Sequence, residues 1–192
     1  MTNLFSQTAE GPPMDETQLV LQALRDTEAF AELYRRHITR VYRYCLAHTG
    51  NQKDAEDLTS QTFIAALEGL ASFRGGGTFA AWILGIASRK RLMLYRGHRR
   101  EVPLDAALHY QSPTLPTDKA AQIRIQMEAV AQALKQIASD RAEAIRLHYF
   151  GGLSHTETAQ ALHKTEAAVK MLISRGLSDL RERTSLALEL EP

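Results

Sequence analysis

The stretch "GLSHTETAQALHKTEAAVKML", residues 152–172, has the pattern of two helices separated by a short break. Ser154 and Glu157 form a Ser-x-x-Glu capping box, which predicts that a helix begins at about residue 154. That helix ends by about His163, because a new cap begins at Thr165. A short helix, a brief turn and a longer second helix are typical of a helix-turn-helix. A helical hairpin that packs in a core and binds nothing has the same pattern, so both interpretations stay open here.

The second of these helices has two different faces. At about 100° per residue, one face consists of Val169, Leu172, Ile173, Gly176, Leu177 and Leu180. The opposite face carries Ala167, Met171, Ser174 and Ser178, with Lys170 and Arg175 beside it. A helix that presents small side chains and flanking cations can enter the major groove of DNA. The second face therefore favours DNA binding without excluding the hairpin.

Helical spacing dominates the rest of the chain from Asp15 onward. Apolar side chains follow steps of three and four between residues 30 and 46, and "TGN" at 49–51 ends that helix. A second helix begins near Asp54. The segment "FRGGGT" at 73–78 is predicted to be a loop, after which Thr78 caps a third helix over 79–96. Almost no segment alternates between apolar and polar residues, so we predict an all-α fold.

A change of composition divides the chain into two small helical domains. Residues 97–122 contain three prolines and little periodicity, which is typical of a flexible linker. Helical spacing returns over 123–137 and again over 141–150, where Gly151 and Gly152 end it. The predicted organisation is a mobile tail at 1–14, a first domain at 15–98, a linker at 99–122, a second domain at 123–183 and a C-terminal tail at 184–192.

Bulk composition excludes several classes of protein. With 44% hydrophobic residues, the 192-residue chain is too apolar for a disordered protein, and its net charge of +1 does not itself indicate a nucleic-acid partner. Cys45 is the sole cysteine, so no internal disulfide can form, which fits a reducing cytoplasm. The N-terminus has no signal-peptide pattern, and no run reaches the roughly 18 apolar residues of a membrane span. We therefore expect a cytoplasmic protein with no stable membrane insertion.

Local segregation of charge singles out residues 69–100. This segment has no Asp or Glu, and its basic residues are Arg74, Arg89, Lys90, Arg91, Arg96, Arg99 and Arg100. It also carries the aromatic residues Phe73, Phe79, Trp82 and Tyr95. A solvated helix end can explain cations near a C-terminus, but such a face normally mixes both signs of charge. Cations beside aromatic rings suit phosphates and unstacked bases, although Phe79 and Trp82 can instead pack into the core.

Other kinds of functional site find less support in the sequence. The glycine loop lacks the GxxxxGK[ST] spacing of a phosphate-binding P-loop. His148, His155 and His163 lie near one another, but their spacings match no common zinc pattern, so solvated or core histidines are the better interpretation. Cys45 lies among apolar helix positions and is expected to be a buried, inert thiol. No catalytic arrangement of side chains is readable, so we expect neither an enzyme nor a cofactor.

Together, the two halves of the chain resemble bacterial RNA polymerase sigma factors of the extracytoplasmic-function (ECF) group in the sigma-70 family. The segment "DAEDLTSQTF" at 54–63 is similar to the helix that docks on the polymerase clamp. The segment "SFRGGGTFAAWILGIASRKR" at 72–91 is similar to the loop and helix that open and read the minus-ten element. Residues 134–182 resemble the domain that reads the minus-thirty-five element. The resemblance implies a region 2-like domain followed by a region 4-like helix-turn-helix domain.

The resemblance also implies three sets of binding residues. The residues expected to bind core polymerase are Asp54, Glu56, Asp57, Gln61 and Phe63. The residues expected to bind the minus-ten element are Phe73, Arg74, Gly75, Gly76, Gly77, Thr78, Trp82, Arg89, Lys90, Arg91 and Arg96. The residues expected to bind the minus-thirty-five element are Arg141, Thr165, Glu166, Ala167, Lys170, Met171, Ser174 and Arg175.

The chain departs from the family's pattern at some of these places. Gln61 stands where the family often has Glu, which removes one charge from the docking surface. Ser88 and Arg89 replace the usual Arg-Asn pair of the minus-ten helix. In and beside the turn of the helix-turn-helix, where the family usually has Gly flanked by Ile, this chain has Thr158, His163 and Lys164.

The function implied by the resemblance is that of a sigma factor. Such a protein binds core RNA polymerase, at the beta-prime clamp and the beta flap, and directs promoter recognition, strand opening and transcription initiation. Its DNA partners are the promoter duplex and the melted non-template strand, and an anti-sigma factor is an expected further partner. One alternative is a helix-turn-helix regulator that binds duplex DNA alone, although a ligand-sensing first domain would need no basic, aromatic surface. An enzyme with an unrecognised helical active site is the other class left open.

Overall fold

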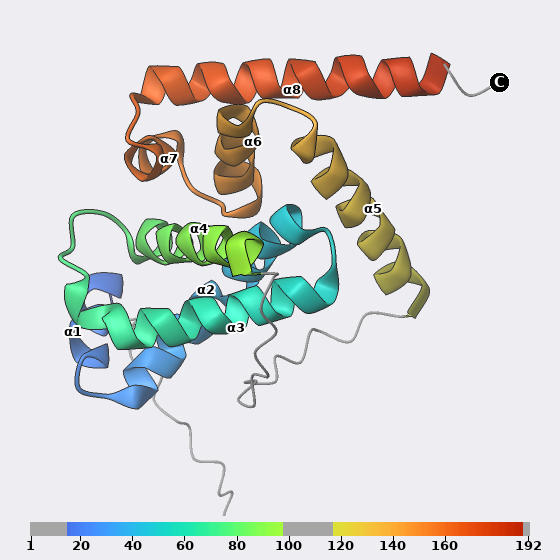
Figure 1. Ribbon diagram of the computed structural model, residues 1–192. Helices are drawn as coiled ribbons and strands as arrows, with labels where there is room; N and C mark the ends of the chain where they lie inside the picture. The colour runs from blue at the N-terminus through green and yellow to red at the C-terminus, as the bar shows by residue number, and fades with distance from the viewer. Residues whose placement is uncertain (1–14, 98–116, 190–192) are drawn as a thin grey trace, which may run out of the picture.

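The computed structural model describes residues 15–97 and 117–189, which form helices joined by short turns (Figure 1). The helical segments are α1 (Glu16–Ala23), α2 (Thr27–Thr49), α3 (Gln52–Gly69), the 3₁₀ turn η1 (Leu70–Ser72), α4 (Phe79–Gly97), α5 (Thr117–Lys135), α6 (Ser139–Ile145), the π-helical segment η2 (Arg146–Phe150), α7 (His155–Leu162) and α8 (Glu166–Glu189). No strand occurs in these two ranges, which confirms the all-α class. We refer to α1–α4 as the first domain and to α5–α8 as the second.

The first domain packs α2, α3 and α4 together, with α1 against α2. Its core contains fully buried side chains from each of the three longer helices, among them Leu33, Tyr44, Phe63, Phe79 and Leu84. Gly50 ends α2 in the left-handed conformation, with a φ of 79°, and the side chain of Asn51 caps α3. The predicted helix end at 49–51 is thereby confirmed.

A break between α1 and α2 is not evident from the helical spacing. The carboxylate of Asp26 accepts a hydrogen bond from the backbone N–H of Glu28 at 2.9 Å and so caps α2. The break directs α1 across α2, where Leu19 and Val20 are buried in the core. Asp is a favoured N-cap residue, but the apolar steps continue on both sides of it and conceal the turn.

The second domain is built around α8, which crosses α6 closely. Gly176 permits this approach, because a Cβ at that position would lie only 2.7 Å from Cδ1 of Ile145. Val169 and Ile173 of α8 pack with buried alanines of α6 and α7. The apolar face predicted for this helix therefore points inward.

Helices α7 and α8 form the predicted helix-turn-helix. The hydroxyl of Ser154 accepts a hydrogen bond from the backbone N–H of Glu157 at 3.1 Å. A carboxylate oxygen of Glu157 accepts one from the backbone N–H of Ser154 at 2.7 Å, so the predicted capping box is confirmed. His163 ends α7 in the left-handed conformation, with a φ of 53°, which His adopts less readily than Gly.

Two helix ends differ from the prediction. Helix α5 begins at Thr117 instead of about residue 123, and α8 continues to Glu189 instead of ending at 183. The added segments, "TDKAAQ" and "TSLALE", contain good helix formers but too few apolar positions to reveal a period. The predicted tail at 1–14, residue 98 at the end of the predicted first domain, and residues 99–116 of the predicted linker lie outside the described part of the chain.

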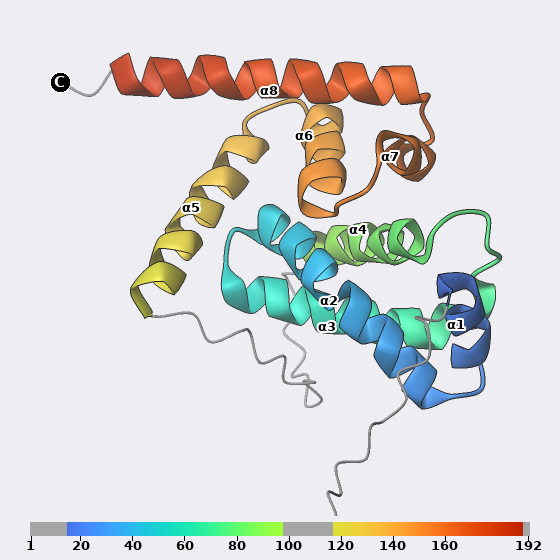
Figure 2. The same ribbon diagram turned by 180° about the vertical axis from the view of Figure 1, so that it is seen from behind.

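The two domains pack against each other, an arrangement that the sequence did not predict (Figure 1 and Figure 2). Helix α5 and segment η2 contact α2, and α7 contacts α4. Leu147 and Leu153 of the second domain belong to the same apolar cluster as the core of the first. A Cβ added to Gly151 would lie 2.7 Å from Cδ1 of Leu84, so only glycine fits without a shift at this contact. The domains therefore share one apolar core where they meet.

A buried polar cluster lies between the same two domains. Glu143 of α6 accepts a hydrogen bond from the Tyr44 hydroxyl at 2.5 Å. Its other oxygen lies 3.1 Å from Nε2 of His48, without hydrogen-bond geometry. Burial alone would raise the pKa of Glu143, but the contacts with His48 and Tyr44 outweigh burial and lower that pKa to about 2. Burial lowers the pKa of His48 to about 4, although Glu143 opposes this shift.

Acid is expected to destabilise the fold through His48. The pKa of this imidazole is about 4 in the fold against an ordinary value of 6.5, so folding opposes its protonation. The destabilisation is absent above pH 6.5 and grows as the pH falls toward 4, reaching about 2 kcal/mol at pH 5. The pKa of Glu143 is about 2, below the ordinary 4.5. Its protonation therefore also lowers the free energy of unfolding, but only below about pH 4.5.

Denaturant unfolding at pH 7 and pH 5 measures this effect. Between these pH values the wild-type chain should lose about 2 kcal/mol more free energy of unfolding than the His48→Gln variant. The other histidines are present in both proteins and cancel in the comparison. Equal losses in the two proteins would show that His48 is not the group responsible.

Candidate nucleic-acid interface

The outward face of α8, with Thr165 just before it, presents the side chains that the sequence assigned to the minus-thirty-five element, except Arg141, which lies on α6. Glu166 is half-buried and Met171 is 52% exposed. The other exposed members are Thr165, Ala167, Lys170, Ser174 and Arg175. Because the apolar face of α8 is fixed against α6 and α7, this polar face is directed away from the core.

Glu166 connects the first turn of α8 to α7. One carboxylate oxygen accepts a hydrogen bond from the Thr156 hydroxyl at 2.9 Å, and the other pairs with Nζ of Lys170 at 2.7 Å. The hydrogen bond from Lys170, followed by that from Thr156, lowers the pKa of Glu166. Lys170 therefore lies along the helix, paired with Glu166.

Ion pairs join α6 to the turn and to the second helix of the helix-turn-helix. Nη1 of Arg141 lies 2.6 Å from Oδ2 of Asp179 in α8. Nζ of Lys164 in the turn lies 2.9 Å from Oδ2 of Asp140 in α6. Arg141 is half-buried. Because it pairs with Asp179, this predicted DNA-binding residue also has a structural contact.

The glycine loop and the start of α4 bring aromatic rings next to exposed cations. The ring centroid of Phe73 lies 5.4 Å from that of Trp82 and 6.0 Å from that of Phe79. Phe79 is only 1% exposed, whereas Phe73 and Trp82 are half-buried. Gly75 has a φ of 69°, which favours glycine in this loop. Of the three rings, Phe79 belongs to the core, and the other two remain partly accessible.

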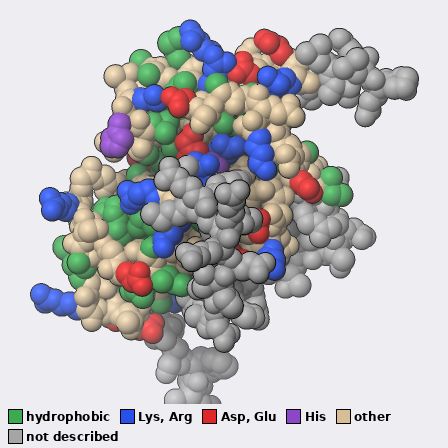
Figure 3. Space-filling model, viewed as in Figure 1, with side chains coloured by type: hydrophobic (Ala, Val, Ile, Leu, Met, Phe, Trp, Pro, Cys, Tyr) green, Lys and Arg blue, Asp and Glu red, His purple; other side chains and the backbone are tan. Residues whose placement is uncertain are grey.

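The basic side chains of the same surface differ in how far they are exposed to solvent. Arg74 and Arg89 are exposed, and Lys90 and Arg91 are half-buried. Nε of Arg91 is buried without a hydrogen-bond partner. Arg96 lies within α4, but its side chain is outside the described part of the structure. Figure 3 shows blue Lys and Arg side chains, with red carboxylates among them, in the band where the two domains meet.

Thr78 lies at the contact between the two domains. Its hydroxyl accepts a hydrogen bond from the backbone N–H of Ala81 at 3.3 Å, as predicted for the cap of α4. The same hydroxyl donates a hydrogen bond to Oε1 of Glu157 in α7 at 2.6 Å. A Cβ on the neighbouring Gly77 would lie 3.4 Å from Oε1 of Gln160, so α7 lies directly over this part of the loop.

The predicted docking residues lie on α3. Asp54 and Asp57 are exposed, and Glu56 and Gln61 are half-buried. Phe63 is only 1% exposed, and its ring packs edge-on against Tyr34 with 4.6 Å between centroids. The four polar side chains can therefore meet a partner directly, while Phe63 supports the helix from behind.

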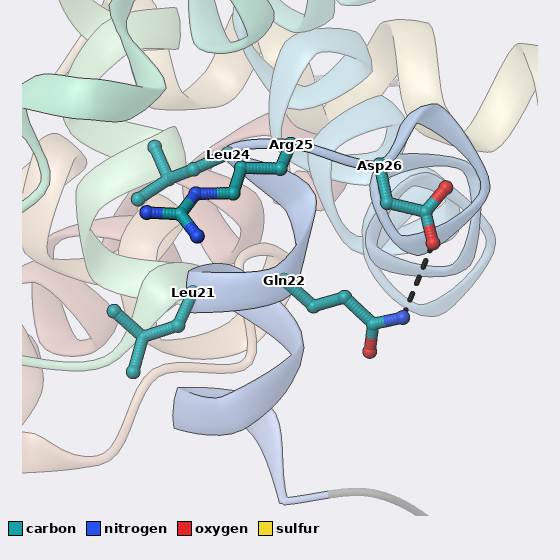
Figure 4. A pocket seen from close by; sticks show the side chains of 5 residues that line it. All are labelled: Leu21, Gln22, Leu24, Arg25 and Asp26. Atoms are coloured by element: carbon teal, nitrogen blue, oxygen red, sulfur yellow. Dashed lines mark hydrogen bonds between the residues drawn. The ribbon is translucent and has the colours of Figure 1, made fainter.

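An open pocket at the turn between α1 and α2 is lined by Leu21, Gln22, Leu24, Arg25 and Asp26, and Gln22 donates a hydrogen bond to Asp26 at 3.1 Å (Figure 4).

Within residues 15–97 and 117–189, no helix has both the length and the apolar character needed to cross a membrane.

His148 and His155 contact each other, and Cys45 is buried. His148 stacks on His155 with 4.4 Å between ring centroids. No group of three His, Cys, Asp or Glu side chains that could hold a metal occurs in the described part of the chain. Cys45 is buried, as predicted, and burial raises the pKa of its thiol to about 12.

Comparisons with known proteins match the chain to two family models. The family model described as Sigma-70 region 2 matches residues 33–101, and the model described as Sigma-70 region 4 matches residues 127–180. The chain is 32% identical over 166 residues to the ECF RNA polymerase sigma factor BldN of Streptomyces coelicolor, covering 81% of this chain and 60% of BldN. It is 24% identical over 172 residues to the RNA polymerase sigma factor YlaC of Bacillus subtilis, covering 88% of this chain and 99% of YlaC.

Two solved structures have a similar fold. CnrH, solved in complex with the cytosolic domain of CnrY, matches with a TM-score of 0.69 at 25% identity, covering 92% of this chain and 99% of that one. The sigma factor RpoE of Bartonella quintana, solved with the anti-sigma factor NepR, matches with a TM-score of 0.58 at 20% identity, covering 86% of this chain and 99% of that one. Region 2 includes α3 and the glycine loop, and region 4 includes the helix-turn-helix. The chain therefore belongs to the sigma-70 family of RNA polymerase sigma factors, within its extracytoplasmic-function group.

Proposed function

We propose that this protein binds core RNA polymerase and directs it to promoters by contacting DNA at two places. The observation that carries the proposal is the presence, in one chain, of an exposed recognition helix and a separate glycine loop with aromatic rings and cations. A regulator that binds duplex DNA alone needs only the first of these surfaces. No catalytic step is assigned to the chain itself, and a protein with this role works in the cytoplasm, where polymerase transcribes.

The second domain is proposed to read the minus-thirty-five element with the outward face of α8. The N-terminal half of a recognition helix approaches base edges in the major groove, and here that half carries Ala167, Lys170 and Met171. Met171 offers no hydrogen bond, but its exposed side chain can contact a thymine methyl group. Arg175, farther along the helix, is better positioned for the DNA backbone.

The first domain is proposed to open the minus-ten element. An unstacked base on the non-template strand would stack on Phe73 beside the glycine loop, and the α4 cations would hold the neighbouring phosphates. Capture of a flipped base offsets an unpairing cost of a few kcal/mol, so strand opening needs no ATP. The segment between the domains would set the distance between the two DNA contacts.

The polymerase-binding surface is proposed to be the exposed side of α3, with Asp54, Glu56, Asp57 and Gln61 against the beta-prime clamp and the second domain near the beta flap. Two proteins of similar fold, CnrH and RpoE, were solved with bound partners, and NepR is an anti-sigma factor. By this similarity, we also expect an anti-sigma factor that covers the binding surfaces of this chain.

The direct test is transcription by core polymerase with and without the purified chain. Sequencing the transcript starts on genomic DNA should reveal one set of promoters that depends on the added chain. The control is core polymerase with the full-length Asp57→Arg variant, which alters the proposed polymerase-binding surface. A chain that binds duplex DNA tightly by itself, and gives no new transcript starts, would instead support the regulator.

Lys170→Ala is expected to relax promoter preference at one minus-thirty-five position. If Lys170 leaves Glu166 to reach a guanine, its loss costs about 1–3 kcal/mol at that position alone. A lysine that only holds phosphate would instead weaken all sequences alike and reduce the salt slope by about one unit. A minus-thirty-five library transcribed at two salt concentrations separates these cases, with Arg175→Ala as the backbone-contact control. If neither preference nor slope changes, α8 is not the reader.

A further inference from the structure

Two carboxylates of the second domain contact the first domain at or beside the DNA-binding surface proposed for it. Glu143 of α6 accepts a hydrogen bond from Tyr44 of α2 at 2.5 Å, and Glu157 of α7 accepts one from Thr78 of the glycine loop at 2.6 Å. Thr78 belongs to the residues expected to bind the minus-ten element. The inner face of the second domain therefore covers part of that surface in the free protein.

The groups around Glu143 form a seat for an anion. Tyr44 and His48 of α2 are fully or almost fully buried, and Nε2 of His48 lies 3.1 Å from the carboxylate. Arg91 of α4 adds its positive charge, which helps to lower the pKa of Glu143. Nε of Arg91 is buried without a hydrogen-bond partner, so this seat retains donor capacity that Glu143 does not use. Arg146, from the second domain itself, lies 3.9 Å from the same carboxylate.

Glu157 has a similar environment at the other end of the contact. Burial alone would raise the pKa of Glu157, but the hydrogen bonds from Thr78 and Ser154 lower it, and the charge of Arg40 in α2 adds a smaller lowering. The guanidinium of Arg40 lies beside the turn before α7, since a Cβ on Gly152 would be 3.5 Å from its Nε. Glu143 and Glu157 thus each accept a hydrogen bond from a hydroxyl of the first domain, and each feels the charge of one of its arginines.

We propose that Glu143 and Glu157 occupy, in the closed free protein, positions that backbone phosphates of promoter DNA take in the complex. Tyr44 and His48 then join Arg91 as a phosphate-binding seat, and the domains must separate before it can accept DNA. The inference rests on the proposed sigma function. Carboxylates and phosphates both present anionic oxygens to hydroxyl and guanidinium donors, so the same groups can hold either. Burying a carboxylate is unfavourable unless it is well paired. The donors and positive charges around Glu143 are therefore those that a buried anion requires.

Closure lowers the apparent affinity of the free chain for DNA. A ligand that binds only the open form has its affinity reduced by the open fraction, so a chain that is nine-tenths closed binds about tenfold more weakly. Removing the charge of both carboxylates should release this inhibition. Glutamine suits both positions because it retains the size of Glu and, at residue 157, can still complete a capping box.

The test compares two double variants of the full chain that remove equal charge. Glu143→Gln/Glu157→Gln loses the two interdomain carboxylates, whereas Glu68→Gln/Glu128→Gln loses two exposed ones on α3 and α5. Binding of the free chain to a fork DNA with a single-stranded minus-ten element is followed by fluorescence anisotropy. The first variant should bind about tenfold more tightly than wild type, and the second should gain much less. Equal gains would attribute the effect to net charge and overturn the proposal.

Adding Tyr44→Phe to the first variant tests the seat itself. The gained affinity should fall several-fold, and equally for all DNA sequences, because a phosphate contact carries no sequence information. Tyr149→Phe, at an exposed tyrosine of η2, is the control and should change nothing. Unaltered binding by the Tyr44→Phe triple variant would mean that DNA does not use this seat. A wild-type chain that fails to direct transcription by core polymerase would refute the sigma function separately from these measurements.

Discussion

The Asp57→Arg variant should fold normally and lose binding to core RNA polymerase. Asp57 is exposed on α3 between Asp54 and Gln61, so its replacement disturbs no buried group of the first domain. Reversing its charge places a cation on an acidic surface that is proposed to meet the clamp. Disrupting a close charge pair at an interface costs about 2–5 kcal/mol, which weakens binding roughly thirtyfold or more.

Glu68→Arg is the matched control for this prediction. Glu68 is also exposed on α3, at the far end of the helix from Asp57, and the variant has the same change of charge. Its affinity for core polymerase, measured by fluorescence titration, should stay near that of wild type. Thermal unfolding of both variants checks that the fold is intact. If the two variants bind alike, α3 docks through other residues or does not dock at all.

Features that depend on neighbouring residues were predictable from the sequence. The Ser154–Glu157 capping box, the end of α7 at His163 and the cap of α4 at Thr78 each need only three or four consecutive positions. The inward face of α8 follows from its apolar period alone. For the same reason, the break at Asp26 was missed, because apolar residues on both sides of it continue a helical spacing.

Features that depend on contacts between distant residues were not predictable. Tyr44 and Glu143 are 99 positions apart, and nothing in either local pattern indicates that they meet. Tyr44 and His48 lie on an apolar helix face, where the spacing marks them only as core residues. The one indication in the sequence was that Glu143 is an acidic residue among apolar neighbours. In the structure its side chain, on α6, is only 15% exposed. Such a residue has to find a partner, but one sequence does not say where.

The sequence predicted which segments form the candidate surfaces, but it did not predict which side chains in those segments are exposed. The aromatic and basic segment from Phe73 to Arg91 was found from composition, but burial then separates Phe79 from Phe73 and Trp82. Phe63 matched the docking motif and is nevertheless in the core. Family motifs contain both contact residues and the residues that support them, and only the fold tells the two apart.

Phe73→Ala is expected to abolish most strand opening while leaving the fold intact. Phe73 is half-buried at the edge of the ring cluster, whereas Phe79, of the same residue type, is 1% exposed beneath it. Loss of one base–aromatic stack removes about 1–3 kcal/mol from the open complex, which lowers its population about fivefold to a hundredfold. Phe79→Ala should instead destabilise the whole domain by about 3–5 kcal/mol.

Three measurements separate these two roles. The thermal unfolding temperature of the free chain should be nearly unchanged by Phe73→Ala and strongly lowered by Phe79→Ala. Permanganate reactivity of minus-ten thymines in a duplex promoter should fall in the Phe73→Ala variant. Transcription from a promoter with a pre-melted bubble should recover, because the unpairing cost has been removed from the reaction. If the bubble template is as impaired as the duplex, Phe73 acts after opening, and Trp82, the other partly accessible ring, becomes the candidate platform, since its face is the remaining aromatic surface beside the glycine loop.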